Sequence, residues 1–288
     1  MSLSNFLNFL DVLFNDDSLT LPIPINWISD LLLKCSLRKF ILSLLFLLPQ
    51  SINAQPATIA VAANMKDAFS EIHAAFKASS GSDLRVVYGS SGNFAAQIMN
   101  GAPFNLLISA DEHFPLELYK NGKTVDSGVV YAIGKLAFIS KKSADTQVGE
   151  SREALAKAII KANKIAIAKP ELAPYGMAAV EYMKAAGLWD LAKEKLIYGD
   201  NIGIATMYVL TGAADAGFTA LSLAKSAEVS KETHFVLLNS KLYEPIKQRM
   251  VLIKGAPRQA IALFQFMQTP QAKLILQKYG YTTPEISP

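Results

Sequence analysis

The sequence predicts an α/β fold divided into two lobes. Buried strands alternate with amphipathic helices over residues 57–120 and again over 151–238, a pattern typical of parallel sheets covered by helices. Two long extended segments, 131–140 and 244–254, separate the second block from the first and from a C-terminal pair of helices. We expect these segments to be crossings between two lobes that close over a cleft by hinge motion. The alternative is one large doubly wound sheet.

The first block opens with a buried strand at 58–63, and Asn64 follows it in the position of a helix N-cap. The helix that ends near Gly81 has one apolar face, because its large apolar side chains recur at helical spacing. These side chains are Met65, Phe69, Ile72 and Phe76. The rest of the block is predicted as strand 84–88, a helix opened by residues 89–93, strand 105–109 and a helix around 115–120.

The second block repeats the alternation, with strands at 164–168, 196–198, 216–220 and 235–238 and helices at 151–161, 175–186, 202–210 and 221–227. The chain ends in helices 257–267 and 269–279, and the second of these has Thr269 as N-cap and Pro270 as its first residue. We therefore predict a leader over 1–54, lobe I over 55–133 plus 244–288, and lobe II over 134–243.

The leader has the order of a secretory signal peptide. A short basic segment, 34–39, precedes a run of nine residues, FILSLLFLL at 40–48, that is apolar except for Ser43, and small residues follow up to Ala54. Nine residues are too few for a membrane span. We predict cleavage after about Ala54, and residues 1–33 read as an extension of the gene model before the true start.

Composition excludes several classes of protein. A chain of 288 residues that is 51% hydrophobic and 18% charged is not disordered and can bury a sizeable core. The net charge is +4 and Lys and Arg are scattered, so no nucleic-acid partner is predicted. The single cysteine, Cys35, lies in the leader, so the mature chain is predicted to need no disulfide and to have no thiolate metal site.

Small polar residues lie between several predicted strands and the helices that follow them. The junctions are Ala63-Asn64, Gly89-Ser90-Ser91-Gly92, Ala173-Pro174-Tyr175-Gly176 and Asp200-Asn201-Ile202-Gly203. Each helix N-terminus leaves N–H groups unpaired and carries a partial positive charge. Several such ends at the carboxyl edge of open sheets would form an anion site without Lys or Arg. The alternative is that these Asn and Ser residues only cap helices.

The motifs of common enzymes are absent from the sequence: no nucleophile elbow, phosphate-binding loop or zinc-protease motif is present. The three histidines, His73, His113 and His234, are widely separated. We therefore predict a protein that is not an enzyme, with no cofactor and no residues that ligate a metal directly. A secreted hydrolase with Ser91 as nucleophile stays as an alternative, and it requires a base within hydrogen-bond reach of Ser91.

The segments at these junctions resemble the periplasmic molybdate-binding proteins of molybdate ABC transporters, members of the type II periplasmic solute-binding family. The matching segments are AAN at 62–64, YGSSG at 88–92, AQIMNGAPFN at 96–105, SADE at 109–112, YAIGKL at 131–136, APYG at 173–176, GAADAGF at 212–218 and YEPI at 243–246. In order along the chain, they extend over nearly all of residues 57–283.

This resemblance implies a two-lobed type II fold, each lobe a mainly parallel sheet flanked by helices, with tetrahedral molybdate or tungstate in the interlobe cleft. The oxyanion-binding residues that it implies are Ala63, the side chain and backbone of Asn64, the hydroxyl and N–H of Ser91, the amide of Tyr175, and the backbone near Asn201 and Ile202. Ala63 stands where some relatives have Thr, which would supply one hydroxyl more.

The resemblance also implies a partner and a location. We expect a periplasmic monomer that delivers its ligand to the membrane permease of an ABC transporter. A protein of the same class that binds sulfate, phosphate or a small organic anion is the alternative, and the size of the oxyanion is what distinguishes them.

Overall fold

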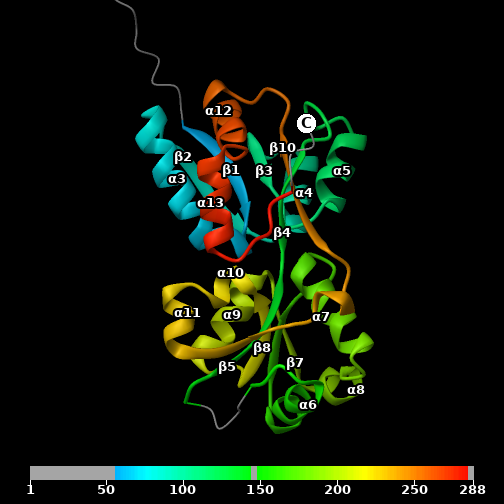
Figure 1. Ribbon diagram of the computed structural model, residues 1–288. Coiled ribbons are helices and arrows are strands. Elements are labelled where there is room, and N and C mark those ends of the chain that lie inside the picture. The colour runs from blue at the N-terminus through cyan, green and yellow to red at the C-terminus, as the bar shows by residue number, and fades with distance from the viewer. Residues whose placement is uncertain (1–55, 144–147, 285–288) are drawn as a thin grey trace, which may run out of the picture. The chain divides into compact units, whose positions relative to one another are not determined.

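The computed structural model describes residues 56–143 and 148–284. These residues belong to one compact unit, Gln55–Pro288, which contains two sheets with helices on their faces (Figure 1). The predicted signal peptide, its cleavage site and residues 1–33 lie outside the described residues. Within the described ranges, no helix combines the length and the apolar character needed to cross a membrane.

The first sheet has the strand order β2-β1-β3-β10-β4. The strands are β1 (Ala57–Ala62), β2 (Leu84–Gly89), β3 (Leu106–Ile108), β4 (Val129–Gly134) and β10 (Ile246–Leu252). The second sheet has the order β7-β6-β8-β5-β9. Its strands are β5 (Leu136–Lys141), β6 (Ile165–Ala168), β7 (Leu196–Gly199), β8 (Ala216–Ala220) and β9 (Thr233–Leu237). We call the first sheet with its helices lobe I and the second with its helices lobe II.

The predicted two-lobed α/β fold is confirmed, but each sheet is mixed rather than mainly parallel, with two parallel and two antiparallel pairings. In lobe I, β1 pairs in parallel with β2 and β3, whereas β10 is antiparallel to β3 and β4. In lobe II, β6 is parallel to β7 and β8, whereas β5 is antiparallel to β8 and β9. The parallel part of each sheet comes from the strand–helix alternation that the sequence shows. The antiparallel part comes from strands that carry the chain from one lobe to the other.

The extended segment predicted at 131–140 is two strands in different sheets. Strand β4 ends at Gly134, β5 begins at Leu136, and Lys135 alone stands between them. The return crossing is longer, because β9 ends at Leu237 and β10 begins at Ile246. The two lobes are therefore joined by two chain segments that lie at corresponding edges of the two sheets (Figure 1).

Helices cover both faces of the first sheet. They are η1 (Ala63–Met65), α3 (Lys66–Ser80), α4 (Ser91–Met99), α5 (His113–Lys120), α12 (Arg258–Phe266) and α13 (Pro270–Lys278). Successive strand residues face opposite sides of a sheet, so alternate residues of β1 enter different cores. Ile59 and Val61 pack with α3 and the C-terminal helices, whereas Ala60 packs with α4 and α5. As predicted, Thr269 caps α13, with its side chain accepting from the N–H of Ala272.

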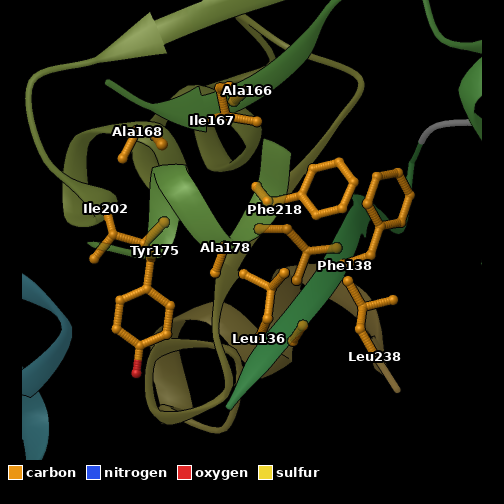
Figure 2. Packing of buried hydrophobic residues seen from close by; sticks show 14 of the residues in the cluster. Leu136, Phe138, Ala166, Ile167, Ala168, Tyr175, Ala178, Ile202, Phe218 and Leu238 are labelled. Atoms are coloured by element: carbon orange, nitrogen blue, oxygen red, sulfur yellow. The ribbon is translucent and has the colours of Figure 1, made fainter. Parts of the chain in front are cut away.

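The helices of lobe II are α6 (Arg152–Lys161), α7 (Pro174–Ala185), α8 (Trp189–Ala192), η2 (Lys193–Lys195), α9 (Ile202–Thr211), α10 (Leu221–Ala224), α11 (Ala227–Glu232) and η3 (Ser240–Leu242). The core of this lobe gathers around β5, β6 and β8, where the rings of Phe138 and Phe218 meet edge to face at 5.0 Å (Figure 2). This cluster also includes Ala62, Ala63 and Ala110 of lobe I. The apolar packing is therefore continuous from one lobe to the other beside the junctions that the sequence singled out.

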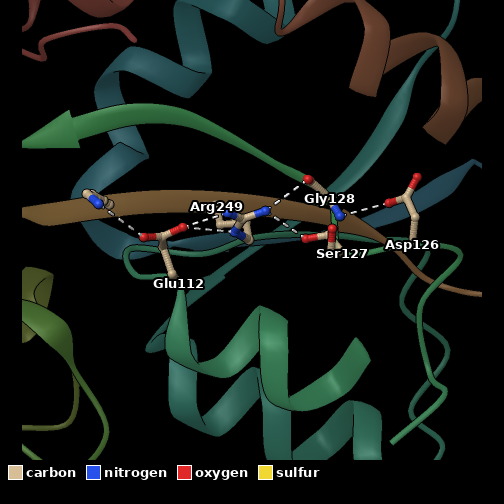
Figure 3. Close-up of polar contacts among 6 residues, drawn as sticks. Glu112, Asp126, Ser127, Gly128 and Arg249 are labelled. Atoms are coloured by element: carbon tan, nitrogen blue, oxygen red, sulfur yellow. Dashed lines mark hydrogen bonds and ion pairs between the residues drawn. The ribbon is translucent and has the colours of Figure 1, made fainter. Parts of the chain in front are cut away.

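Arg249 joins strand β10 to two loops of lobe I. Its guanidinium donates to the Glu112 carboxylate, with one N···O distance of 2.6 Å, and to the carbonyls of Ser127 and Gly128 (Figure 3). The Arg249 side chain is only 17% exposed, so these bonds are shielded from water. Charge-assisted hydrogen bonds in such a setting are among the stronger polar contacts in a protein.

Replacing Arg249 with methionine is expected to lower the free energy of unfolding by about 2–4 kcal/mol, because Glu112 and two carbonyls lose their donor. Urea unfolding would measure the change. The matched control is Lys247→Met, since the Lys247 ammonium is 54% exposed and lies 3.9 Å from Glu112. That control should cost less than about 0.5 kcal/mol. Equal losses in the two variants would contradict the role given to Arg249.

Candidate functional site

A small cavity lies between the lobes at the predicted junctions. Its lining residues are Ala62, Ala63, Asn64, Gly89, Ser90, Ser91, Ala110, Ala173, Pro174, Tyr175, Asn201 and Ile202. None of these residues is charged, and all six oxyanion-binding candidates named from the sequence are among them. The structure therefore brings the four junctions together at one cavity.

Four helix N-termini meet at this cavity. The residues before η1, α4, α7 and α9 are Ala62, Ser90, Ala173 and Asn201, and each lines it. Helices α4, α7 and α9 each begin near the carboxyl end of a parallel strand, which is where open α/β sheets bind ligands. The first N–H groups of a helix lack partners within the helix and carry partial positive charge. The cavity thus has the electrostatics of an anion site built from neutral groups.

The α4 end supplies two serine hydroxyls. Ser91 Oγ accepts a hydrogen bond of 2.9 Å from the Ala110 N–H, so its own proton remains available to donate. Ser90 is only 4% exposed, and its Oγ has no hydrogen-bond partner among the described residues. Burying a hydroxyl without a hydrogen-bond partner costs free energy. Ser90 Oγ is therefore a candidate to donate to a bound ligand. Of the two serines in the GSSG turn, only Ser91 was predicted from the sequence to bind the anion.

Lobe II supplies the N-termini of α7 and α9. The side chain of Asn201 accepts from the N–H of Ile204 and caps α9. Asn201 therefore has the helix-capping role that was the alternative for it in the sequence. Its amide nitrogen has no hydrogen bond to a described residue. Tyr175 packs its ring beside Ile202, with its hydroxyl at the edge of the lobe II cluster (Figure 2). That hydroxyl accepts from Gln248 Nε2 at 3.0 Å.

Asn64 differs from its predicted role as an N-cap. It lies inside the 3₁₀ turn η1, because the chain turns tightly before α3, and no side chain caps η1 or α3. Its amide nitrogen donates to Gln248 Oε1 at 3.0 Å and to the Tyr281 hydroxyl at 2.8 Å. Its Oδ1 is buried and has no partner among the described residues. Two unpartnered polar atoms, Asn64 Oδ1 and Ser90 Oγ, therefore belong to residues that line the same cavity.

Asn64 belongs to a buried polar network that was not predicted from the sequence. Gln248, which is fully buried, accepts from Tyr131 OH and Asn64 Nδ2 and donates to Tyr175 OH. Burial raises the pKa of the Tyr131 and Tyr175 hydroxyls well above the usual value, so both stay neutral. The available signal was a glutamine at alternate spacing with Ile246 and Met250, on the buried face of β10.

Hydrogen bonds connect the lobes on several sides of the cavity. The Gly92 N–H of α4 donates to the Leu172 carbonyl of lobe II at 3.0 Å. Ser222 of α10 donates to the Asn64 carbonyl at 2.7 Å and accepts from Tyr281 OH. The contact between Gln248 and Tyr175 is a third such connection. The structure therefore has the two lobes closed on each other.

Asp111 lies beside the cavity in the loop between β3 and α5. Its carboxylate accepts from Ser109 Oγ at 2.8 Å, yet burial outweighs these bonds and raises the pKa of Asp111 from 3.8 to about 6. Between about pH 4 and pH 6, the Asp111 carboxyl is therefore protonated in the folded protein and ionised in the unfolded chain. This contribution to stability is present below pH 4 and is lost as the pH rises through 6.

Replacing Asp111 with asparagine is expected to stabilise the protein by about 2 kcal/mol at pH 7.5, because it removes a buried charge and keeps the acceptor oxygen. At pH 4 the gain should vanish, since Asp111 is then protonated in the folded protein. Urea unfolding at the two pH values measures both numbers. The same gain at pH 4 and pH 7.5 would contradict burial of a charge as the cause.

No group of three or more His, Cys, Asp or Glu side chains that could hold a metal ion occurs within residues 56–143 and 148–284. The cavity itself offers hydroxyl and N–H donors. Such donors suit the oxygen atoms of an anion rather than a bare cation.

A cavity between two α/β lobes that are connected by two chain crossings is typical of the hinged solute-binding proteins. Comparison with known families agrees with this class. The chain belongs to the family of bacterial extracellular solute-binding proteins, whose sequence profile matches residues 57–282.

Two curated relatives are similar over most of their length. The molybdate-binding protein ModA of Rhodobacter capsulatus is 37% identical over 227 residues, which cover 78% of this chain and 87% of that protein. ModA of Azotobacter vinelandii is 36% identical over 82% of this chain and 93% of that protein. The solved periplasmic molybdate-binding protein of Azotobacter vinelandii superposes with a TM-score of 0.72 at 30% identity, covering 80% of this chain and all of that one.

Proposed function

We propose that this protein captures molybdate or tungstate between its two lobes and delivers the anion to the permease of an ABC transporter. The observation that carries the proposal is the uncharged cavity on which four helix N-termini converge. The names of the relatives at 36–37% identity support molybdate as the ligand. Neutral donors suit an oxyanion that must be bound tightly and then released on opening, since no ion pair has to be broken.

The proposed donors come from both lobes. In lobe I they are the side chain and backbone N–H of Asn64, the hydroxyls of Ser90 and Ser91, and the N–H of Ser91. In lobe II they are the N–H of Tyr175, the N–H of Ile202 and the amide of Asn201. Ala63 lines the cavity with a methyl group. An anion held by both lobes stabilises their closed arrangement, because opening would remove half of its donors.

The remaining parts of the proposal concern location and assembly. The relative of known structure is described as periplasmic, and this supports export of the present protein to the same compartment. We propose that it acts there as a monomer and as a binding protein without catalytic activity. Ser91 Oγ supports the last point, because its recorded hydrogen bond is to the Ala110 N–H rather than to a basic side chain.

Calorimetric titration of the protein with molybdate, tungstate, sulfate and phosphate at neutral pH tests the proposal. We expect tight binding of one molybdate or tungstate per chain and no heat from the two smaller anions, whose oxygens fall short of donors spaced for a larger tetrahedron. Tight binding of sulfate or phosphate in place of molybdate would overturn the ligand, and no binding of any of the four would overturn the function.

Ser90 and Ser91 provide a prediction in which stability and affinity move in opposite directions. Ser90→Ala is expected to stabilise the free protein by about 1 kcal/mol, because it removes a buried hydroxyl without a partner, and to weaken molybdate binding about tenfold. Ser91→Ala is the matched control: it leaves the Ala110 N–H unpaired, so it should lower both stability and affinity. Thermal unfolding without ligand and calorimetry measure the two quantities. A Ser90→Ala variant that binds molybdate normally would exclude Ser90 from the site.

A further inference from the structure

The buried network at the cavity contains more acceptors than its protons can serve. Tyr131 OH lies 2.9 Å from both the Ser109 carbonyl and Gln248 Oε1, but a phenol has one proton. At the same time Asn64 Oδ1 is buried without a donor. Both problems arise from the direction in which the side-chain amides of Asn64 and Gln248 point.

Turning both amides by half a rotation removes the first problem and changes the second, because Asn64 then has an NH₂ group in place of Oδ1 without a protein partner. Gln248 Nε2 then donates to Tyr131 OH and to Asn64 Oδ1, and Tyr131 is free to donate to Ser109. Gln248 Oε1 accepts from Tyr175 OH, and Tyr281 OH donates its one proton to Asn64 Oδ1 in place of Ser222. Neither amide can turn alone, because two carbonyl oxygens or two NH₂ groups would then face each other at the 3.0 Å that separates them.

Asn64 lines the cavity, and the two arrangements differ in which of its side-chain atoms has no protein partner. In the first it is an oxygen, which repels an oxyanion. In the second it is an NH₂ group, which donates to one. We propose that Gln248 is a positioning residue: its amide orientation sets which atom of Asn64 faces the bound anion, and an oxyanion selects the NH₂-facing arrangement.

Gln248 also contacts the other lobe. It bonds to Tyr175 OH, and Tyr175 sits in the first turn of α7, whose N-terminus lines the cavity. One buried glutamine thus connects Asn64 of lobe I with the helix that supplies donors from lobe II. Gln248 does not itself line the cavity, so an effect on affinity must pass through the groups it holds.

The inference rests on the proposed anion binding, and its test compares variants with sodium molybdate as the probe. Gln248→Met keeps the volume and removes both hydrogen-bonding atoms, and it is expected to weaken molybdate binding about 10- to 100-fold. Gln97→Met, the same change at an exposed position of α4, should bind as the unmodified protein does. Asn64→Ala should lose about as much affinity as Gln248→Met.

The double variant separates positioning from a general loss of stability. If Gln248 acts through Asn64, Asn64→Ala with Gln248→Met should bind within about threefold of either single variant. Losses that multiply in the double variant would overturn the inference, and so would normal binding by Gln248→Met.

A spectroscopic readout keeps the inference testable if Gln248→Met does not fold. In the unmodified protein, the side-chain NH₂ resonances of Asn64 and Gln248 should both shift on addition of molybdate, because both amides turn. Movement of the Asn64 resonances with those of Gln248 unchanged would overturn the coupling and leave the proposed function standing. An unmodified protein that binds none of the four oxyanions would overturn both.

Discussion

Replacing Gly92 with leucine is expected to weaken oxyanion binding by about 100-fold or more while changing the stability of the fold little. Gly92 lies in the first turn of α4, where lobe I touches lobe II. A Cβ at this position would lie 2.8 Å from the Phe114 ring and 3.1 Å from the Leu172 backbone of the other lobe. A leucine side chain therefore holds the lobes apart. It also moves the Gly92 N–H out of hydrogen-bond distance of the Leu172 carbonyl.

Two measurements distinguish a closure defect from a folding defect in this variant. Urea unfolding without ligand should stay within about 1 kcal/mol of the unmodified protein, because each lobe keeps its own core. Calorimetry with molybdate should show the loss of affinity. Ala96→Leu adds a similar side chain to an exposed position of the same helix and should bind normally. Tight binding by Gly92→Leu would show that the lobes need not approach closely here.

Replacing Gly128 with alanine is expected to lower the free energy of unfolding by about 3–5 kcal/mol, the largest stability loss that we expect from a single methyl group in this chain. Gly128 has a φ of +67°, and a Cβ there would collide with the Met250 carbonyl oxygen and lie 2.6 Å from Val251 Cγ1. Strand β10 cannot move away from the added methyl group, because Arg249 of this strand is hydrogen-bonded to the Gly128 carbonyl.

Gly122 offers a matched control for this change. Its φ is +68°, and its Cβ would meet only the end of the Lys254 side chain, at 3.7 Å. Gly122→Ala therefore carries the backbone strain without the collision and should cost about 1–2 kcal/mol. Thermal or urea unfolding of the two variants gives the difference. Equal costs would mean that backbone conformation alone, rather than the approach of β10, fixes the glycine at 128.

The parts of the fold that sequence could predict are those with a local signal. Helix α3 shows its apolar face at helical spacing, and α13 shows its cap and first-turn proline, so both were predicted within a residue or two. The four junctions were also visible, because Ser, Asn and Gly at a strand end are local features. Their meeting at one cavity follows from parallel strands whose carboxyl ends share an edge.

Other features have no local signal. Residues 131–140 are apolar apart from Lys135 and Ser140, and one charged residue is not enough to show that the chain leaves one sheet for the other at Lys135. Helices α8 and α11 are short, and α11 has a single buried apolar residue, Val229, which gives no periodicity. The bond from Asn64 to Gln248 joins residues 184 positions apart. Such a pair can be found only once the sheet order is known.

The order of strands has a consequence for how the chain folds as it is synthesised. Lobe II is one uninterrupted stretch, and all five of its strands have emerged once β9 is complete at Leu237. Lobe I cannot be completed then, because β10 lies between β3 and β4 in its sheet. A chain truncated before Ile246 would thus carry all the strands of lobe II, whereas in lobe I strand β4 would be separated from β2, β1 and β3. The last strand to leave the ribosome is the one that brings Gln248 and Arg249 to the centre of lobe I, so the half of the molecule that was started first is finished last.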